Sequence, residues 1–260
     1  MLGTAMMGLA AATRSRSDDI ATVRLAYELG IRAFDTARVY APAGDPLYAE
    51  ALLAEALYGR DDVLVMTKGG HFRTPEGGFA VDNSPARLRR DVEDSLRALR
   101  TERIDLYLLH RADDESVPLV DSVGELCRLR DEGKIAAVGV SNVRLDQLRA
   151  AADTTSIAAV ENQYSPLCTE WDPVSRAECD AVMAECEARG IVYVAYSPLK
   201  SDGPSITELR PDLGSGSCSP AASVLAEILA LSPAVAVITG ASRPETVRDA
   251  ATAVGRSLER

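Results

Sequence analysis

Four residues with acid–base side chains stand at, or a few positions after, the ends of predicted strands. These residues are Asp35, Tyr40, Lys68 and His110. Each predicted strand before them is a short apolar run, and Tyr40 lies a few residues into the loop that follows Asp35. Since the carboxyl ends of the strands of a closed parallel barrel surround one mouth, we expect these side chains to meet there.

Their chemical types favour proton transfer. A free phenol with a pKa near 10 is a slow acid at neutral pH, but a neighbouring ammonium favours the phenolate and lowers that pKa. Lys68 can act in this way on Tyr40, while Asp35 keeps Lys68 in place and charged. His110 can then polarise or orient an oxygen atom. Taken singly, these residues have ordinary explanations as turn, loop or solvated surface residues, whereas their joint position at strand ends indicates a site.

The elements that must position these residues alternate between strand and helix along all 260 residues. Strands are predicted over residues 2–5, 31–35, 63–67, 104–109, 135–140, 158–164, 191–196 and 234–239. Helices are predicted over residues 17–30 with Ser17 as N-cap, 49–58, 84–99 with Ser84 as N-cap and Pro85 as the first helical residue, 118–132, 175–189 ending before Gly190, 221–231 and from Pro244 onward. This pattern predicts an α/β fold, a single (β/α)8 TIM-barrel domain spanning 1–260. A doubly wound open sheet is the alternative, but no G-x-G-x-x-G follows the first strand.

Composition narrows the function classes. The formal net charge is -11 and the sequence pI is near 4.8, which argues against nucleic acid and anionic membranes as partners. The five cysteines form no Cys-x-x-Cys pair, so we expect neither a disulfide framework nor a metal site, and we expect a reducing cytoplasm. No signal peptide or membrane-spanning run is predicted.

Seven short motifs at successive strand ends resemble those of the aldo-keto reductase family. They are Leu2-Gly3-Thr4, Phe34-Asp35-Thr36-Ala37 with Tyr40, Thr67-Lys68-Gly69-Gly70, Ile104 to His110, Gly139-Val140-Ser141-Asn142, Tyr196-Ser197-Pro198-Leu199 and Thr239 to Glu245. Each motif is weak alone, but together they span nearly the whole chain in the family's order. The resemblance implies that Asp35, Tyr40, Lys68 and His110 form the family's catalytic tetrad.

The resemblance also implies NADPH/NADP+ as an extended cofactor bound without a Rossmann motif. Ser141 and Asn142 would bind its carboxamide and Tyr196 would lie under its nicotinamide ring. Ser197 and Leu199 would face the pyrophosphate. The remaining residues expected at the cofactor are Gly3, Thr4, Gly240 and, for the adenosine 2′-phosphate, Ser242, Arg243 and Arg248. Glu161 stands where the family usually has a glutamine facing the carboxamide, and a bulge between it and Gln163 could exchange their roles.

The chain departs from the family at both ends. The N-terminal hairpin that usually covers the barrel floor is absent and the first strand is nearly cut away, so either the true N-terminus lies upstream or the barrel is trimmed. The loop that usually follows the last helix is missing. We therefore expect an open substrate pocket. Its walls are expected to come from His71, Phe72, Phe79, the acidic run 113–115 and Trp171.

The resemblance predicts an NADPH-dependent oxidoreductase that reduces an aldehyde or ketone to an alcohol, acting on a small-molecule carbonyl substrate in the cytoplasm. Two alternatives stay open. One is a cofactor-binding regulatory subunit, and the other is a family member recruited for non-redox proton transfer such as dehydration or cyclisation. The sequence identifies neither the substrate nor the oligomeric state.

Overall fold

In the computed structural model of the chain, which describes residues 1–112, 116–168, 174–215 and 219–257, eight parallel strands form one sheet in chain order. The strands of this sheet are β1 (Leu2–Gly3), β2 (Ala33–Asp35), β3 (Leu64–Gly69), β6 (Ile104–Leu109), β7 (Ile135–Ser141), β8 (Ile157–Gln163), β9 (Val192–Tyr196) and β10 (Val235–Val237).

The first and last strands meet through backbone hydrogen bonds just beyond β10. The Gly3 amide donates to the Thr239 carbonyl over 2.9 Å, and the Thr239 amide donates to the Met1 carbonyl over 3.0 Å. The sheet therefore closes on itself, which confirms the predicted (β/α)8 barrel and excludes the doubly wound alternative.

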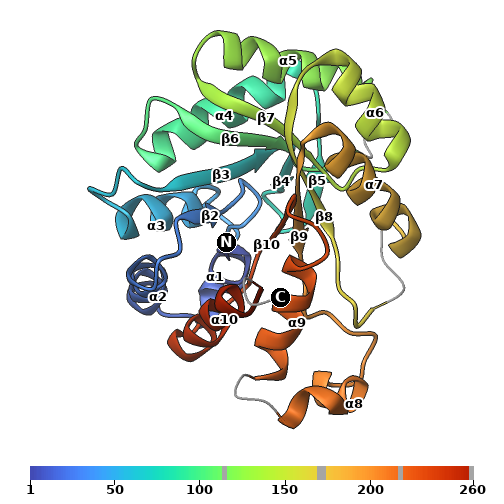
Figure 1. Cartoon of the computed structure of the whole chain (residues 1–260). Coiled ribbons are helices and arrows are strands. Elements are labelled where there is room, and N and C mark those ends of the chain that lie inside the picture. Colours follow the sequence, from blue (N-terminus) through green and yellow to red (C-terminus); the bar gives the residue numbers. More distant parts are fainter. Residues whose placement is uncertain (113–115, 169–173, 216–218, 258–260) are drawn as a thin grey trace.

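Helices surround the strands on the outside of the barrel (Figure 1). The helices are α1 (Ala5–Leu9), α2 (Arg16–Glu28), α3 (Tyr48–Ala56), α4 (Pro85–Leu99), α5 (Leu119–Asp131), α6 (Leu145–Thr154), α7 (Arg176–Arg189), α8 (Ile206–Leu209), α9 (Pro220–Leu229) and α10 (Pro244–Ser257), with 3-10 turns at Ala11–Thr13 and Pro211–Ser215. None of the described helices has the length and apolar character needed to cross a bilayer.

Helix-start signals in the sequence are largely confirmed. Ser84 caps α4 by accepting from the Arg87 amide, with Pro85 in the first turn as expected. The predicted cap at Ser17 is wrong, because Ser15 has the extended backbone and accepts from the Asp18 amide.

Several elements have no counterpart in the sequence-based prediction. They are α1, α6, α8 and a small antiparallel hairpin of β4 (His71–Arg73) and β5 (Phe79–Val81). The hairpin lies in the Gly-containing stretch that was predicted as a loop. Its turn is held by main-chain bonds between Thr74 and Gly78, a local arrangement that hydrophobic periodicity does not report.

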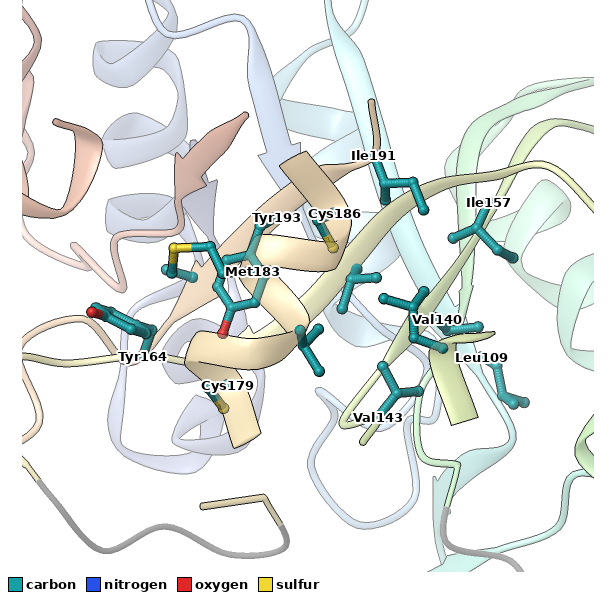
Figure 2. Packing of buried hydrophobic residues seen from close by; sticks show 14 of the residues in the cluster. Leu109, Val140, Val143, Ile157, Tyr164, Cys179, Met183, Cys186, Ile191 and Tyr193 are labelled. Carbon is teal, nitrogen blue, oxygen red and sulfur yellow. The ribbon is translucent and has the colours of Figure 1, made fainter. Parts of the chain in front are cut away.

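The apolar core has two layers separated by the sheet. The outer layer packs helices against strands; Figure 2 shows Cys179, Met183 and Cys186 of α7 beside Tyr193 of β9. The inner layer fills the barrel and consists of Met66, Leu106, Leu108, Ala159, Val194 and Ile238.

The inner layer explains why polar residues gather at one end of the barrel. Side chains alternate across a strand with a period of two, so the residue two positions after an inward apolar residue also points inward. Lys68 follows Met66, His110 follows Leu108, and Tyr196 follows Val194 in this way; Glu161 follows Ala159. The apolar layer thus supports a layer of polar groups at the C-terminal ends of the strands.

Candidate active site

Lys68 is the centre of the polar layer, with a fully buried side chain at the end of β3. Its ammonium hydrogen-bonds the Asp35 carboxylate and lies 3.1 Å from the Thr36 carbonyl oxygen. The same nitrogen lies 3.4 Å from the Tyr40 hydroxyl and 3.2 Å from a Glu161 carboxylate oxygen. The structure therefore brings three of the four predicted catalytic residues into direct contact, together with a second carboxylate.

A buried polar network behind β3 fixes the position of Lys68. The Thr67 hydroxyl donates to the Glu50 carboxylate over 2.7 Å, and the Arg38 amide donates to the Lys68 carbonyl over 3.2 Å. The Arg38 guanidinium also donates to Asp94 over 2.9 Å. Because such networks hold their members in one arrangement, the strand end is rigid at the point where the ammonium emerges.

The Tyr40 loop is positioned by close contact with α1. A Cβ atom at Gly8 would lie only 2.0 Å from the Tyr40 carbonyl oxygen, so the helix can approach this loop only with a glycine there. The Tyr40 amide donates to the Ala37 carbonyl, which forms a tight turn after β2. The phenol is thereby directed toward Lys68.

His110 completes the group from the end of β6. Its amide donates to the Gly69 carbonyl over 3.0 Å, and its carbonyl accepts from the Asn142 side chain over 3.0 Å. The imidazole lies edge-on to the Tyr40 ring with centroids 5.8 Å apart, and it contacts the His71 ring at 5.1 Å. From the sequence we expected His71 in the pocket wall, and His71 lines the small cavity beside His110.

The charges of this group depend on burial and on one another. Burial disfavours the Lys68 ammonium, but the carboxylates of Asp35 and Glu161 outweigh it and raise the Lys68 pKa. Burial raises the pKa of Asp35, while Lys68 lowers it. Burial also raises the pKa of Glu161, to about 8, although Lys68 opposes the increase. Glu161 therefore exchanges its proton near neutral pH.

Tyr40 and His110 are both shifted toward their neutral forms. Burial raises the pKa of Tyr40, and the Lys68 ammonium opposes but does not reverse this increase. The net direction is opposite to the expectation from sequence, because burial of the phenol outweighs the Lys68 ammonium and the charges of Asp35 and Glu161 add to the increase. Burial and the charge of Lys68 lower the pKa of His110 well below its ordinary value, so its imidazole is uncharged at neutral pH.

A cavity of about 150 Å³ opens onto these groups. Besides Tyr40, His110 and Glu161, its walls include the hydrogen-bonded pair Asn142 and Tyr196, in which the Tyr196 hydroxyl donates to Asn142 over 2.7 Å. Asn142 has a left-handed backbone with φ of 56°, which turns its amide back toward the cavity wall. Such backbone conformations in residues other than glycine occur often at functional sites.

Ser141 is buried and supports the residues of this cavity. Its hydroxyl donates to the Glu161 main-chain carbonyl over 2.8 Å and accepts from the Asn142 side-chain amide over 3.1 Å. The predicted pair Ser141 and Asn142 is thus tied to the strand that carries Glu161. The pairing of β8 with β9 runs without a shift from Ala159 to Gln163, so no bulge exchanges the two side chains.

A second cavity, of about 620 Å³, is lined by Ser197, the residue next to Tyr196 of the first cavity. Its described walls include the predicted cofactor residues Ser197, Leu199, Gly240, Ser242 and Arg243. Ser197 has a left-handed backbone with φ of 51°, as Asn142 does at the first cavity. The structure therefore gathers these predicted residues around this second cavity, which we call the hollow.

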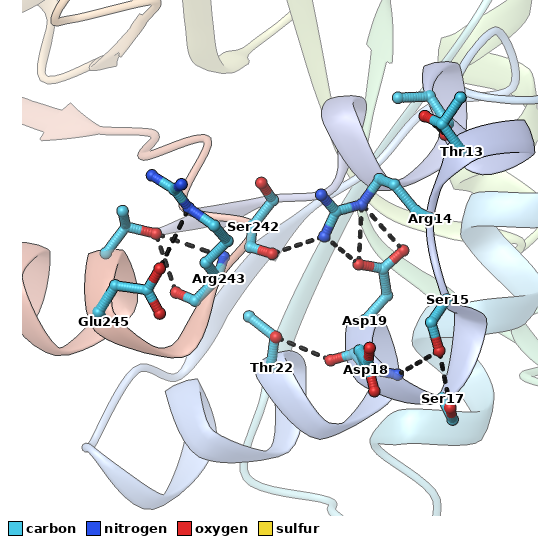
Figure 3. A network of polar contacts seen from close by, with 12 residues as sticks. Thr13, Arg14, Ser15, Ser17, Asp18, Asp19, Thr22, Ser242, Arg243 and Glu245 are labelled. Atoms are coloured by element: carbon cyan, nitrogen blue, oxygen red, sulfur yellow. Dashed lines mark hydrogen bonds and ion pairs between the residues drawn. The ribbon is translucent and has the colours of Figure 1, made fainter.

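Arg14 lines this hollow, and Figure 3 shows its polar contacts. Its guanidinium pairs with the buried Asp19 carboxylate of α2 and donates to the Ser242 carbonyl over 2.6 Å. The loop before α10 is thereby tied to the beginning of the chain. Sequence reasoning assigned no role to Arg14, because only closure of the barrel brings it beside Ser242.

The predicted phosphate-binding arginines lie on the surface. Arg243 has a side chain that is 67% exposed and pairs with Glu245 over 3.3 Å, so a bound phosphate would compete with that carboxylate. Arg248 is exposed on α10 and does not line the hollow. The structure thus brings Arg243, but not Arg248, to the other predicted cofactor residues.

The other predicted residues have structural contacts. Thr4 is fully buried and donates its hydroxyl to the Asp35 carbonyl over 3.0 Å, and Gly3 has no room for a Cβ because Ile238 would lie 2.6 Å away. Phe72 packs under the Arg87 guanidinium at 3.6 Å, away from the small cavity. Trp171 and the acidic run 113–115 fall outside the described residues.

The fold and the polar group at the barrel mouth define a (β/α)8 enzyme. Comparison with known families is specific: the model of the Aldo/keto reductase family matches residues 1–210. The chain therefore belongs to the aldo-keto reductase family and is an oxidoreductase.

Relatives support the same conclusion. An uncharacterized oxidoreductase of Schizosaccharomyces pombe is 31% identical, covering 92% of this chain and 74% of its own. The probable aldo-keto reductase 1 of Glycine max is 33% identical over 76% of this chain and 55% of its own. The glycerol dehydrogenase of Gluconobacter oxydans superposes with a TM-score of 0.80 at 26% identity, over 96% of this chain and 84% of that one. An aldo-keto reductase of Klebsiella pneumoniae in complex with NADPH superposes with a TM-score of 0.74 at 28% identity, over 98% of this chain and 84% of that one.

Proposed function

We propose that the protein reduces an aldehyde or ketone to an alcohol with NADPH, and that Tyr40 donates the proton. The observation that carries this proposal is the contact of one buried ammonium, Lys68, with the Asp35 carboxylate and the Tyr40 hydroxyl, beside the neutral imidazole of His110. The Klebsiella pneumoniae relative, which is described in complex with NADPH, supports the choice of cofactor.

The residues at the two cavities fit a nicotinamide dinucleotide. Gln163 has a buried side-chain nitrogen without a hydrogen-bond partner among the described residues, and it lies at the end of β8 beside Tyr196 of β9. A carboxamide would offer an acceptor for such a donor. Tyr196 and Asn142 would hold that end, whereas the hollow between Ser197 and Arg243 would hold the phosphates and the adenosine.

The residues of the chain divide the proton chemistry among them. The cofactor supplies a hydride to the carbonyl carbon when it is bound. Tyr40 gives its phenolic proton to the oxygen, and Lys68 stabilises the phenolate that remains. Asp35 holds Lys68 in place, and His110 orients the carbonyl oxygen through a neutral N–H group. The apolar layer below excludes water from this end of the barrel.

The direct test is the absorbance of reduced nicotinamide while a panel of aldehydes, ketones and sugar-like carbonyls is added to the purified protein. Oxidation of NADPH that depends on a carbonyl and yields the alcohol supports the proposal. Tight NADPH binding without turnover of any carbonyl would instead support a cofactor-binding regulatory subunit. A cytoplasmic location is part of the proposal.

A further inference from the structure

Glu161 gives the site one more negative charge than the ammonium can balance. Lys68 carries the single positive charge in direct contact, whereas Asp35 and Glu161 are two carboxylates, each with a side chain only 3% exposed. A buried charge without compensation is costly, so such a group takes up a proton instead. The two carboxyl groups therefore hold one proton between them near neutral pH, while Lys68 stays charged.

The number of donors on Lys68 leads to the same conclusion. An ammonium has three N–H donors, but four oxygen atoms surround this one. Three of them accept a hydrogen bond from it: the Asp35 carboxylate, the Thr36 carbonyl at 3.1 Å and the Tyr40 hydroxyl at 3.4 Å. The fourth, a Glu161 carboxylate oxygen at 3.2 Å, forms an ion pair with the ammonium but no hydrogen bond. The Tyr40 contact is the longest of the four. An ionised Glu161 thus competes with Tyr40 for the ammonium.

We propose that Glu161 is a second counter-ion of Lys68, and that loss of its proton withdraws the ammonium from Tyr40 and slows carbonyl reduction. Glu161 is a positioning residue in this proposal, because it acts on Tyr40 through Lys68. The proposal rests on the function proposed above and assigns to that site a dependence on pH.

Other charged and titratable groups face Glu161 from the neighbouring elements. Asp35 of β2 and Tyr40 of the following loop lie around the same ammonium, Tyr196 comes from β9, and His71, His110 and Arg111 line the cavity. His110 is neutral at the pH in question, so it does not compensate Glu161. Burial and the Asp35 charge raise the pKa of Glu161 to about 8, and Lys68 only partly offsets them.

The sign of the effect follows from these charges. Below about pH 8 Glu161 is protonated, and the ammonium is shared by Asp35, Thr36 and Tyr40. Above it, the Glu161 carboxylate attracts the ammonium and raises the pKa of Tyr40 further, which makes the phenol a weaker proton donor. A charge change at this range alters a pKa by about one to three units, and general-acid rates follow only part of such a change. We therefore expect kcat/KM to fall about tenfold as Glu161 ionises.

Glu161→Gln tests the proposal because glutamine has the same shape and no titrating proton. With NADPH saturating, kcat/KM for the best carbonyl is measured from pH 6 to pH 10 in the parent and in the variant. The parent should lose about tenfold across the ionisation, and the variant should show no such fall. Glu125→Gln is the matched control: Glu125 is another buried carboxyl, pairs with Arg89 and Arg128 instead of Lys68, and should leave the fall in place.

A second measurement does not depend on catalysis. Infrared spectra of the cofactor-free protein should contain a protonated-carboxyl band that disappears as pH rises through about 8 and is missing from Glu161→Gln. If no carbonyl is reduced, the proposed function fails, while this titration still decides the protonation of Glu161. If reduction proceeds but Glu161→Gln keeps the alkaline fall, the inference about Glu161 is overturned. It is also overturned if the parent and Glu161→Gln have the same carboxyl band at every pH.

Discussion

Two parts of the site, the buried group around Lys68 and the wall of the hollow at Arg243, each place a cation where the proposed reaction needs one. Their surroundings are opposite. Lys68 is fully buried and touches two carboxylates and a phenol. The Arg243 side chain is 67% exposed and pairs with the equally exposed Glu245. The first charge is enclosed by protein, and the second is surrounded by water.

This difference determines how each cation can act. Inside the barrel every charge changes the pKa of its neighbours, because there is little water to screen it. At the surface, salt and water weaken the same attraction, so Arg243 can contribute affinity but cannot alter the chemistry. Substitutions in the buried corner should therefore change rates and pH dependence, whereas those at Arg243 should change binding and its dependence on salt.

Tyr40→Phe should have the largest effect, since it removes the proposed proton donor and leaves the two cavities intact. Loss of one positioned acid commonly costs about a hundredfold or more in rate. The loss should lie in kcat, while the dissociation constant of NADPH, measured by fluorescence titration, should change little. A variant that retains more than a tenth of the parent kcat would remove Tyr40 from the proposed role.

Arg243→Ala should weaken NADPH binding by about tenfold and leave NADH binding nearly unchanged, because only NADPH carries a 2′-phosphate for the guanidinium. The exposure of Arg243 places the effect at the small end of charge-assisted contacts, and added salt should reduce it. Titration of both cofactors at two salt concentrations measures this. Arg248→Ala is the matched control, since Arg248 does not line the hollow. Equal affinity of the parent for NADPH and NADH would contradict the prediction.

Glu161→Gln should also change stability with a definite dependence on pH. The folded-state pKa of Glu161 is raised from 4.5 to about 8, so between these values the folded protein binds more protons than the unfolded chain. Its free energy of unfolding therefore falls as pH rises through that window, and the variant lacks this loss. Relative to the parent, Glu161→Gln should gain about 1 kcal/mol or more between pH 5 and pH 9. Denaturant unfolding at both pH values measures the gain, and a constant difference would argue against burial of an ionising group.

The smallest expected effect concerns the two redox states of the cofactor. An ionised Glu161 near the nicotinamide would favour the cationic oxidised ring over the neutral reduced one. Glu161→Gln should therefore shift relative affinity toward NADPH by about threefold above pH 8, and by less at pH 6, where both side chains are neutral. Dissociation constants of NADP+ and NADPH in parent and variant decide this. An unchanged ratio at high pH would mean that the nicotinamide does not experience the charge.

Much of the barrel could be predicted from sequence because periodicity and caps are local signals. Ser84 with Pro85, and Gly190 with its left-handed φ of 69° after α7, marked helix ends that the structure confirms. The order of the strands followed from their alternation with helices. The contacts of Lys68 with Asp35 and Tyr40 were also expected, since strand ends of a barrel converge.

What sequence could not predict depends on partners that are distant in the chain. The pKa of Tyr40 is raised and not lowered, because burial outweighs the effect of the Lys68 ammonium and the charges of Asp35 and Glu161 raise the pKa further. Arg14 reaches Ser242 only after the first and last strands pair. Neither effect has a signature in neighbouring residues.

The pairing of Gly3 with Thr239 also has a consequence for synthesis of the chain. The proposed catalytic residues through His110 leave the ribosome well before β10, after which the ring around them closes. Until then β1 and the newest strand are open edges, which can pair with other chains. Contacts of such long sequence separation also form slowly. The nascent protein should therefore depend on protection of these edges, and the first turnover should come only after β10 has emerged and the ring has closed.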